Sequence, residues 1–412
     1  MKKQHLPVEA TDSRDQVSQR NGDRSPKSSP SLSKRAFLGA GGAALLAGCL
    51  GDDTEMAQSD DGSDVVPDIP RVEDPPAAVY VPTHRETMAH LPPVYAGEYA
   101  LSPMITYPHQ FWTVTGSETE LVLPPDRSGV HLMVTPWDPV TELVLPIDSG
   151  ATFRISLHGD VIETVTPWPM LSQTMGFHFG DNLPLPVDDT YTIEIELPPL
   201  TTRKEGTFEG RFEEAVTGSF EFVYDEDFRQ RLIENVEYLD EQYWGERGTL
   251  EPLDHGDVIS VEGRILDDME HEGDGHSHHE NGMAADHDHR APYSTVPRME
   301  DYPGRTLGDP TSGDAIIGVQ YLDADDALLV SPRTPYNRIP LADMAMTVTG
   351  AVEGELTQTI DPTLGLHYRL EESLEPGDSI TIVFDSPPQV SRHAGFETAF
   401  LAMDPVEVTM PE

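Results

Sequence analysis

The sequence is poor in cysteine and in basic residues. It has one cysteine, Cys49, in 412 residues, which excludes a disulfide framework. It has 26 Lys and Arg against 73 Asp and Glu, a formal net charge of −47. Because a protein needs basic side chains to neutralise phosphates, nucleic acid is excluded as a partner. Acidic residues spread along the whole chain are typical of a salt-adapted surface, so we expect a halophilic source.

Long apolar runs and the common catalytic motifs are also missing. No stretch of the mature chain is long and apolar enough to span a bilayer. The sequence has no nucleophile elbow, His-Glu-x-x-His pair, phosphate-binding loop or dinucleotide fingerprint. We therefore predict a binding protein and not an enzyme.

The N-terminal residues have the features of an export signal. Lys34-Arg35 followed by Phe37 and Leu38 resembles a twin-arginine (Tat) signal with Lys in place of the first Arg. Leu46-Ala-Gly-Cys49 resembles a lipobox, so cleavage after residue 48 would leave Cys49 as a lipidated N-terminus. A buried N-terminal helix is the alternative, which the many glycines disfavour. Residues 49–77, which are acidic and rich in Ser, Asp and Pro, are predicted to be a disordered tether.

Short alternating apolar runs, separated by Pro, Gly and Asp, fill two parts of the chain. They predict β-strands in residues 78–224 and again from Ala315 to Met410. Between them, Asp225 is expected to cap one amphipathic helix, whose apolar positions run from Phe228 to Tyr243. The predicted fold is mostly β, with two immunoglobulin-like β-sandwich domains: residues 78–248, including the helix, and residues 302–412. Residues 249–301 form a loop-rich linker.

The two predicted sandwiches share features at one spacing. His178, Tyr191 and Pro198-Pro199 stand 189 residues before the corresponding His367, Ile380 and Pro387-Pro388. This pattern predicts an internal duplication, and two unrelated sandwiches with similar turns are the alternative. At this spacing the second copy keeps only the counterpart of His178. We therefore expect His367 to be structural, and a metal site to lie wholly in the first copy.

Histidine and methionine gather in the first sandwich. His131 and Met133 lie two residues apart on a predicted strand, so their side chains share one face. Met170, Met175 and His178 follow in a segment that Pro and Gly interrupt, which we expect to be a connection between strands. Imidazole and thioether groups are ligands for Cu(I), whereas Fe(II) usually takes harder oxygen donors. Packing in the core is the alternative role for these side chains.

The run from Pro169-Met170 to His178, with His131 before it and Pro198-Pro199 after it, resembles the extracytoplasmic Fe2+ transport protein family. The resemblance covers about residues 130–224 and fits a halophilic archaeal lipoprotein setting. It implies an immunoglobulin-like sandwich with a surface copper or iron site that serves iron uptake. The family ligands fall on His131, Met170 and His178.

This sequence departs from the family at two places. The acidic ligand of the family falls on Met133, and its later histidine segment, after the double proline, falls on residues 201–208, which contain no histidine. The remaining donor set is softer, which favours copper. The candidates to complete it are Met175, His109 and His84.

A second metal-binding feature is an acidic, glycine-containing tract between residues 269 and 290. Its composition cannot form a core, and we expect a flexible loop that binds transition metals weakly, in several geometries. A solvated loop without function is the alternative. The histidines of this tract are His271, His276, His278, His279, His287 and His289.

Together these features predict an exported protein, lipid-anchored at the outer face of the cytoplasmic membrane. It would bind a copper or iron ion and pass it to a membrane metal permease. The alternative function is that of a cell-surface β-sandwich protein with a structural or protein-binding role. A homodimer is left open.

Overall fold

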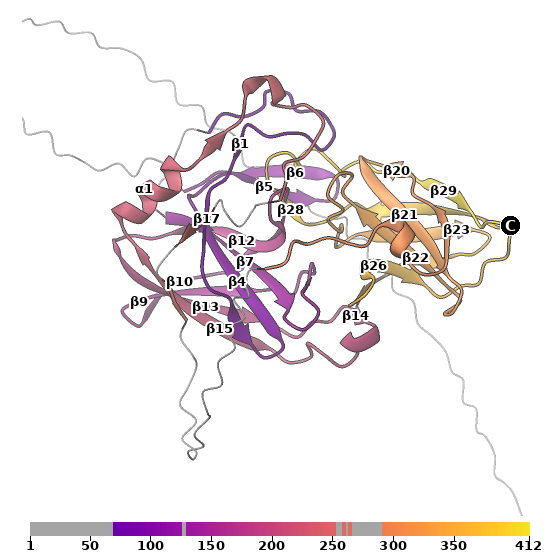
Figure 1. The fold of residues 1–412 in the computed structure, drawn as a ribbon, viewed down its shortest axis with the longest axis horizontal. Coiled ribbons are helices and arrows are strands. Elements are labelled where there is room, and N and C mark those ends of the chain that lie inside the picture. Colours follow the sequence, from indigo (N-terminus) through magenta and orange to yellow (C-terminus); the bar gives the residue numbers. More distant parts are fainter. Residues whose placement is uncertain (1–68, 126–128, 253–257, 261–262, 266–290) are drawn as a thin grey trace, which may run out of the picture. The chain divides into compact units, whose positions relative to one another are not determined.

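The computed structural model describes residues 69–125, 129–252, 258–260, 263–265 and 291–412. The predicted export signal with Cys49, most of the predicted tether and the histidine-rich tract lie outside these residues. The described chain is mostly β, with several sheets and one α-helix (Figure 1), which confirms the predicted fold class. Within it, no helix combines the length and the apolar character that a membrane span requires.

Two sheets form the first sandwich. The smaller sheet has five strands in the order β10 (Asp160–Val165), β9 (Thr152–Leu157), β13 (Asp189–Leu197), β15 (Val216–Tyr224) and β18 (Gly263–Ile265). The larger sheet has the order β17 (Val258–Ser260), β2 (Met88–His90), β4 (Tyr99–Thr106), β7 (Gly129–Asp138), β12 (Gly176–Pro184), β11 (Trp168–Ser172), β28 (Ser391–Arg392), β5 (Phe111–Thr115) and β6 (Glu118–Val122). The short strands β3 (Val94–Ala96) and β8 (Leu143–Val144) pair with β4 and β7.

Two further sheets form the second sandwich. The first has the order β14 (Arg203–Lys204), β25 (Thr357–Asp361), β26 (Gly365–Leu370), β22 (Ala327–Arg333), β21 (Ala315–Leu322) and β19 (Arg305–Gly308), with β20 (Thr311–Ser312) on β21. The second has the order β24 (Gly354–Glu355), β23 (Ala345–Gly350), β27 (Ser379–Ser386) and β29 (Val406–Thr409). Three 3-10 turns lie at Gly206–Phe208, Glu241–Tyr243 and Met299–Asp301.

The single α-helix of the described chain, α1 (Glu226–Glu234), is shorter than predicted. Asp225 caps it as expected, because its side chain accepts a hydrogen bond of 2.7 Å from Phe228 N. Phe228 and Leu232 are buried. The predicted continuation to Tyr243 is wrong, because the chain leaves the helix at Asn235 and forms β16 (Glu237–Tyr238) against β1 (His84–Arg85).

Strand alternation separates two different faces of the larger sheet. On β7, Val130, Leu132 and Val134 face the hydrophobic core between the two sheets of the first sandwich. Since side chains alternate along a strand, His131 and Met133 lie on the other face, and both are fully buried. The face opposite the core is therefore covered by protein as well.

Strand pairing crosses the predicted domain boundaries in both directions. β14, which lies in sequence between β13 and β15 of the first sandwich, pairs in parallel with β25 of the second. Conversely, β28 lies between β11 and β5 in the larger sheet of the first sandwich. Figure 1 shows β28 beside β5. Each sandwich therefore contains a strand from the other part of the chain. The predicted domain boundaries, residues 78–248 and 302–412, remain predictions.

The predicted duplication has one local parallel in the structure. His178 Nδ1 lies 3.3 Å from Gly176 O, and His367 Nδ1 lies 3.0 Å from Gly365 O. Both glycines have positive φ, 74° and 72°, which glycine adopts readily. The duplication itself stays a prediction.

Candidate metal centre

The buried outer face of the larger sheet carries histidine and methionine side chains from neighbouring strands. Cross-strand register places Met104 opposite Met133, His131 opposite Asn182, and Met170 opposite His178. Paired residues of a sheet lie on the same face. The sequence therefore directs these side chains to one surface by alternation alone.

Met170 and His178 do not lie in a connection between strands, as we predicted from Pro and Gly. They lie on β11 and β12, which form a hairpin. Pro169 is tolerated in β11 because the parallel pairing with β28 involves only Met170 and Leu171 of this strand. Met175 lies in the turn between the two strands.

Three of the predicted ligands converge on Gly180 of β12. A Cβ atom built on Gly180 would lie 3.0 Å from His131 Nε2, 3.0 Å from Met170 Sδ and 3.3 Å from a ring carbon of His178. Any larger residue would fill this space. The structure thus brings together the residues that the family resemblance selected, around a position that only glycine leaves open.

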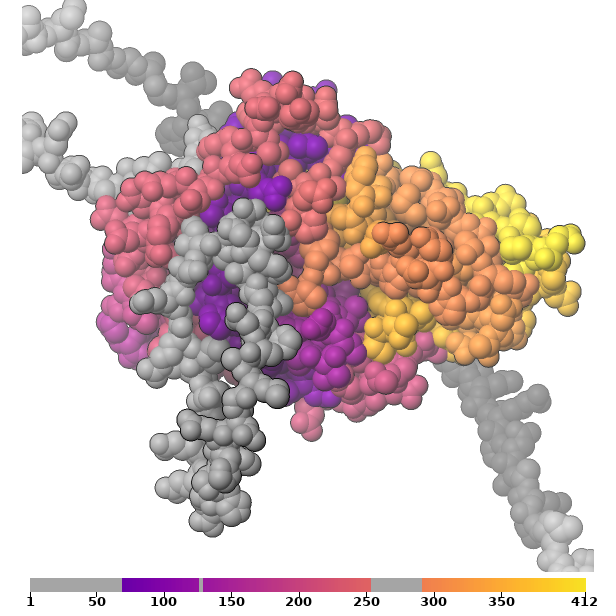
Figure 2. Space-filling view, viewed as in Figure 1, coloured from indigo at the N-terminus to yellow at the C-terminus, as the bar shows by residue number. Residues whose placement is uncertain are grey.

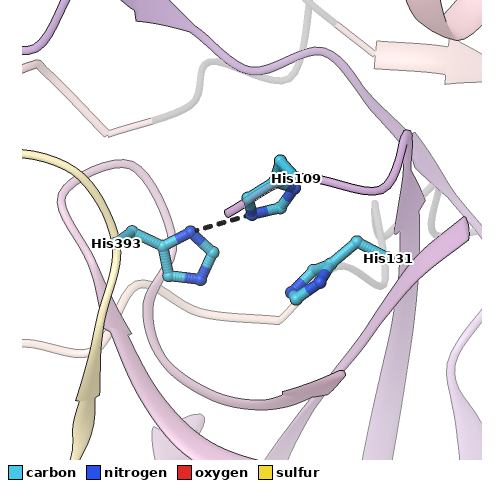
Figure 3. A group of neighbouring side chains, drawn as sticks. All are labelled: His109, His131 and His393. Carbon is cyan, nitrogen blue, oxygen red and sulfur yellow. Dashed lines mark hydrogen bonds between the residues drawn. The ribbon is translucent and has the colours of Figure 1, made fainter. Parts of the chain in front are cut away.

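Two further histidines complete this cluster. His109 lies between β4 and β5, and His393 directly follows β28. One ring nitrogen from each of His109, His131 and His393 lies within 4.8 Å of the others, and all three rings are buried. Figure 3 shows the rings facing one another, with a contact of 3.2 Å between His109 Nε2 and His393 Nδ1. His178 Nε2 lies 3.1 Å from His393 Nε2.

Hydrogen bonds fix the orientation of three rings. His109 Nδ1 lies 3.1 Å from Tyr107 O, and His178 Nδ1 contacts Gly176 O. His131 Nδ1 lies 3.0 Å from Asn182 Oδ1. Because these oxygens only accept, Nδ1 carries the proton in each neutral ring and Nε2 presents its lone pair to the cluster. Histidines that bind metals usually have this arrangement.

Asn182 positions two of these histidines. Its Oδ1 accepts from His131 Nδ1 and from His109 N, at 3.0 and 3.2 Å, and its Nδ2 donates to His109 O at 2.8 Å. The amide orientation follows from these contacts, since only the NH2 group can donate to a carbonyl. Asn182 therefore links the strand histidine to the loop histidine.

With all four rings neutral, the contacts of the cluster have fewer protons than they need. His393 faces the lone pairs of both His178 and His109, but a neutral imidazole has one proton for the two contacts. His131 Nε2 is buried and has no hydrogen-bond partner among the described residues, which is costly for a polar atom. A bound cation would satisfy these nitrogens at once.

A carboxylate whose side chain is 13% exposed lies beside the histidines. Glu86 Oε1 is 3.3 Å from His109 Nε2 and 3.5 Å from His393 Nδ1. Burial opposes its ionisation, but attraction to His109, His393 and His84 in their protonated forms outweighs burial and holds the pKa of Glu86 well below its usual value. The ionised carboxylate can balance the charge of a bound cation.

The segment that carries Glu86 is held by the chain after α1. Val81 N donates to Glu246 O at 2.9 Å, and Gly245 N donates to Val81 O at 3.0 Å. These two segments lie together at the top of the view in Figure 2, in indigo and rose. A pocket of about 210 Å³ lies beside this segment and is lined by His84, Glu86 and His109 among others. An ion can reach the cluster from this side.

His393 is held by backbone contacts to the first sandwich. His393 N donates to Leu171 O at 3.1 Å. Gly395, with φ of 91°, lies so close to Gln173 that an added Cβ would be 2.4 Å from Gln173 Nε2 and 2.6 Å from Tyr80 O. Glycine is therefore required at this point for the segment to approach.

The pKa values of the histidines are suited to metal binding. Burial lowers the pKa of His109 to about 4, although Glu86 opposes this shift. Burial, with repulsion from His393, holds the pKa of His131 and His178 well below the usual value. These three rings are therefore neutral at pH 7, the form that binds a metal.

This lowering predicts a two-step release of metal as the pH falls. Ions that the histidine-rich tract at residues 271–289 is predicted to hold weakly are expected to leave first. Because the pKa values of His109, His131 and His178 are lowered, these rings take up protons at a lower pH than usual, and the ion of the cluster is expected to stay bound longer as the pH falls. Metal content after dialysis at pH 7, 5 and 3.5 tests this. Complete release between pH 7 and 6 would contradict it.

The other predicted ligands lie next to this cluster. Met133 and Met175 pack with Met88 and Met104, and Gly180, which adjoins the histidines, is the register partner of Met133. His84 is buried, and its Nε2 has no hydrogen-bond partner in the described structure. His367 lies in the second sandwich, where its Nε2 is 4.0 Å from Glu205 Oε2.

Glu86 and His393 were missed by the sequence analysis. Glu86 lies before the first long strand and has no motif around it. For His393 a signal was present, because the histidine that the family carries after its double proline is missing after Pro198-Pro199 but occurs after Pro387-Pro388. The sequence analysis did not use this signal, because it assumed that every ligand lies in the first copy.

Comparisons with known proteins give a limited result. Residues 300–409 match the model of a domain of unknown function (DUF7350). No curated protein matches the sequence. Two structures of FetP from uropathogenic Escherichia coli strain F11 are similar: a copper-bound variant, with 19% identity over 34% of this chain and 97% of that chain, and the protein as isolated, with 18% identity over 34% and 96%. The TM-score is 0.27 for both.

Proposed function

We propose that this protein binds a copper or iron ion outside the cytoplasm, for metal uptake or transport, and catalyses no reaction. The observation that supports this most is the buried cluster of His109, His131, His178 and His393. His109, His131 and His178 present Nε2 lone pairs to this cluster, and Met170 and Glu86 lie at its border. A bound cation would satisfy inward-facing lone pairs that are otherwise costly to bury.

The donor set favours copper over iron. Imidazole and thioether ligands suit copper in both oxidation states, and divalent copper binds nitrogen ligands more tightly than divalent iron does. Glu86 adds one hard oxygen donor, which also allows Fe(II). We therefore expect copper to bind more tightly when both ions compete.

Metal analysis of the full chain, purified without a metal-affinity step, tests the proposed function. About one tightly held copper or iron ion per chain, retained after dialysis against a weak chelator, is expected. His178→Ala removes one inward lone pair and should lower the copper affinity at least about tenfold. A parent protein that holds no ion after copper or iron is added would overturn the proposal.

The proposed place of action is the outer face of the cytoplasmic membrane, with the lipid on Cys49. Cys49→Ser removes the only thiol of the chain. It is expected to release the protein into the medium or to leave it unprocessed. Fractionation of cells that express the parent or the variant measures this. Equal membrane fractions would show that attachment does not depend on Cys49.

The proposed partner is a membrane metal permease that receives the ion. A permease encoded next to this protein would support this role. Loss of copper or iron uptake in cells that lack the protein, with recovery by the parent but not by His178→Ala, is the expected result. If the parent and His178→Ala restore uptake equally, the ion site is not needed for transport.

A further inference from the structure

We infer that Met88, Met104, Met133 and Met175 form a second site, which binds a soft monovalent cation such as Cu(I) or Ag(I). Among the buried hydrophobic residues that the structure describes, these four form a cluster of their own. They account for four of the 14 methionines of the chain. Their exposed fractions are 1%, 4%, 0% and 7%, so water does not compete for the sulfur atoms.

The cluster is assembled from four separate segments. Met88 lies on β2, Met104 on β4 and Met133 on β7, while Met175 comes from the turn between β11 and β12. Met104 and Met133 are direct cross-strand partners, and their Cβ atoms are therefore about 5 Å apart. Long, unbranched thioether side chains that start at this spacing can direct their sulfur atoms to one point.

The composition of the cluster differs from that of the cores. The two large cores consist mainly of branched aliphatic and aromatic residues, and Met346, for example, packs among such side chains in the second core. A hydrophobic cluster made of methionine alone is unlike either of these two cores. Thioether groups are soft, neutral ligands that select Cu(I) over Cu(II) and over hard cations.

The cluster adjoins the histidine site but does not share its ligands. Met133 is the register partner of Gly180, on which His131 and Met170 converge. A monovalent ion among the four sulfur atoms would thus lie next to the ion of the histidine site. The two sites differ in donor type, so they can be removed separately.

The double variant Met88→Leu, Met104→Leu tests this site. Leucine has nearly the same volume as methionine and lacks the sulfur, so packing is kept. The full chain is titrated with Ag(I), and with Cu(I) under anaerobic reducing conditions, against a chelator of known affinity. The parent is expected to hold two tight monovalent ions, and the double variant one. Its binding of Cu(II) should be unchanged.

Control variants distinguish this site from the histidine site. Met346→Leu changes a buried methionine outside the cluster and should leave both ions in place. His178→Ala should remove the other ion and keep the one at the methionines. X-ray absorption of the Cu(I) protein should show sulfur ligands that the double variant loses. Met175→Leu, at the turn, replaces the double variant if that variant does not fold.

Two results would overturn the inference. One is a parent protein that binds a single Cu(I) ion, which His178→Ala removes. The other is a double variant with the same Cu(I) stoichiometry and the same sulfur signal as the parent. Either would make the cluster a part of the core only. The histidine site would remain unaffected by both results.

Discussion

Replacement of His393 by alanine is expected to lower the copper affinity at least about 100-fold, because His393 is the only histidine with contacts to both His109 and His178 in the described structure. Without this ring, the Nε2 lone pairs of His109 and His178 have no histidine between them. Glu86 also loses its contact with His393 and keeps the one with His109. Competition against a copper chelator measures the change.

His367→Ala is the matched control for this variant. His367 is also buried, and burial also lowers its pKa to about 4. It lies on β26 of the second sandwich, outside the cluster around His393. The copper affinity of His367→Ala should equal that of the parent, although its melting temperature can fall. If both variants bind copper equally well, His393 is not a ligand.

The origin of His393 changes the expectation for separate fragments. The sequence predicts that residues 78–248 hold the tight site alone and that the second copy holds none. In the structure, β28 brings a histidine of the second part into the first sandwich. A fragment of residues 78–248 therefore lacks one of the four histidines of the cluster, and we expect weaker copper binding by it than by the full chain.

The strands and the ligands on them could be predicted because their signals are local. The alternation in Val130-His-Leu-Met-Val places His131 and Met133 on one face whatever the rest of the fold does. The proline-methionine run and His178 lie within a few residues of each other. A single hairpin brings them together, so their spacing in the sequence was enough to predict that they are neighbours.

The remaining ligands depend on contacts that no local pattern records. His393 is 215 residues from His178 and 284 from His109 in sequence. It reaches them through two residues of β28, a strand too short for an alternating pattern. Glu86 reaches the site because β1 pairs with β16, after α1. The end of α1 at Asn235, which makes this pairing possible, was also missed.

Gly180→Ala is expected to lower the copper affinity about 100-fold without removal of any ligand. The added methyl group would lie 3.0 Å from both His131 Nε2 and Met170 Sδ, closer than side-chain contacts normally are. These groups can move by a few tenths of an ångström in the metal-free protein, because side chains tolerate small shifts. If His131 and Met170 move by that amount, they can no longer hold an ion, because the distances between a metal ion and its ligands vary by only about 0.2 Å.

The control for this variant is Gly218→Ala on β15, in the other sheet of the first sandwich. A Cβ there would lie 2.7 Å from Val94 Cγ1, so the substitution should overpack the core and cost about 1–3 kcal/mol of unfolding free energy. Its copper affinity should stay at the parent value, since no ligand is near. Thermal unfolding and copper titration of both variants separate stability from binding. A Gly180→Ala protein that binds copper like the parent would show that the ion does not lie at Gly180.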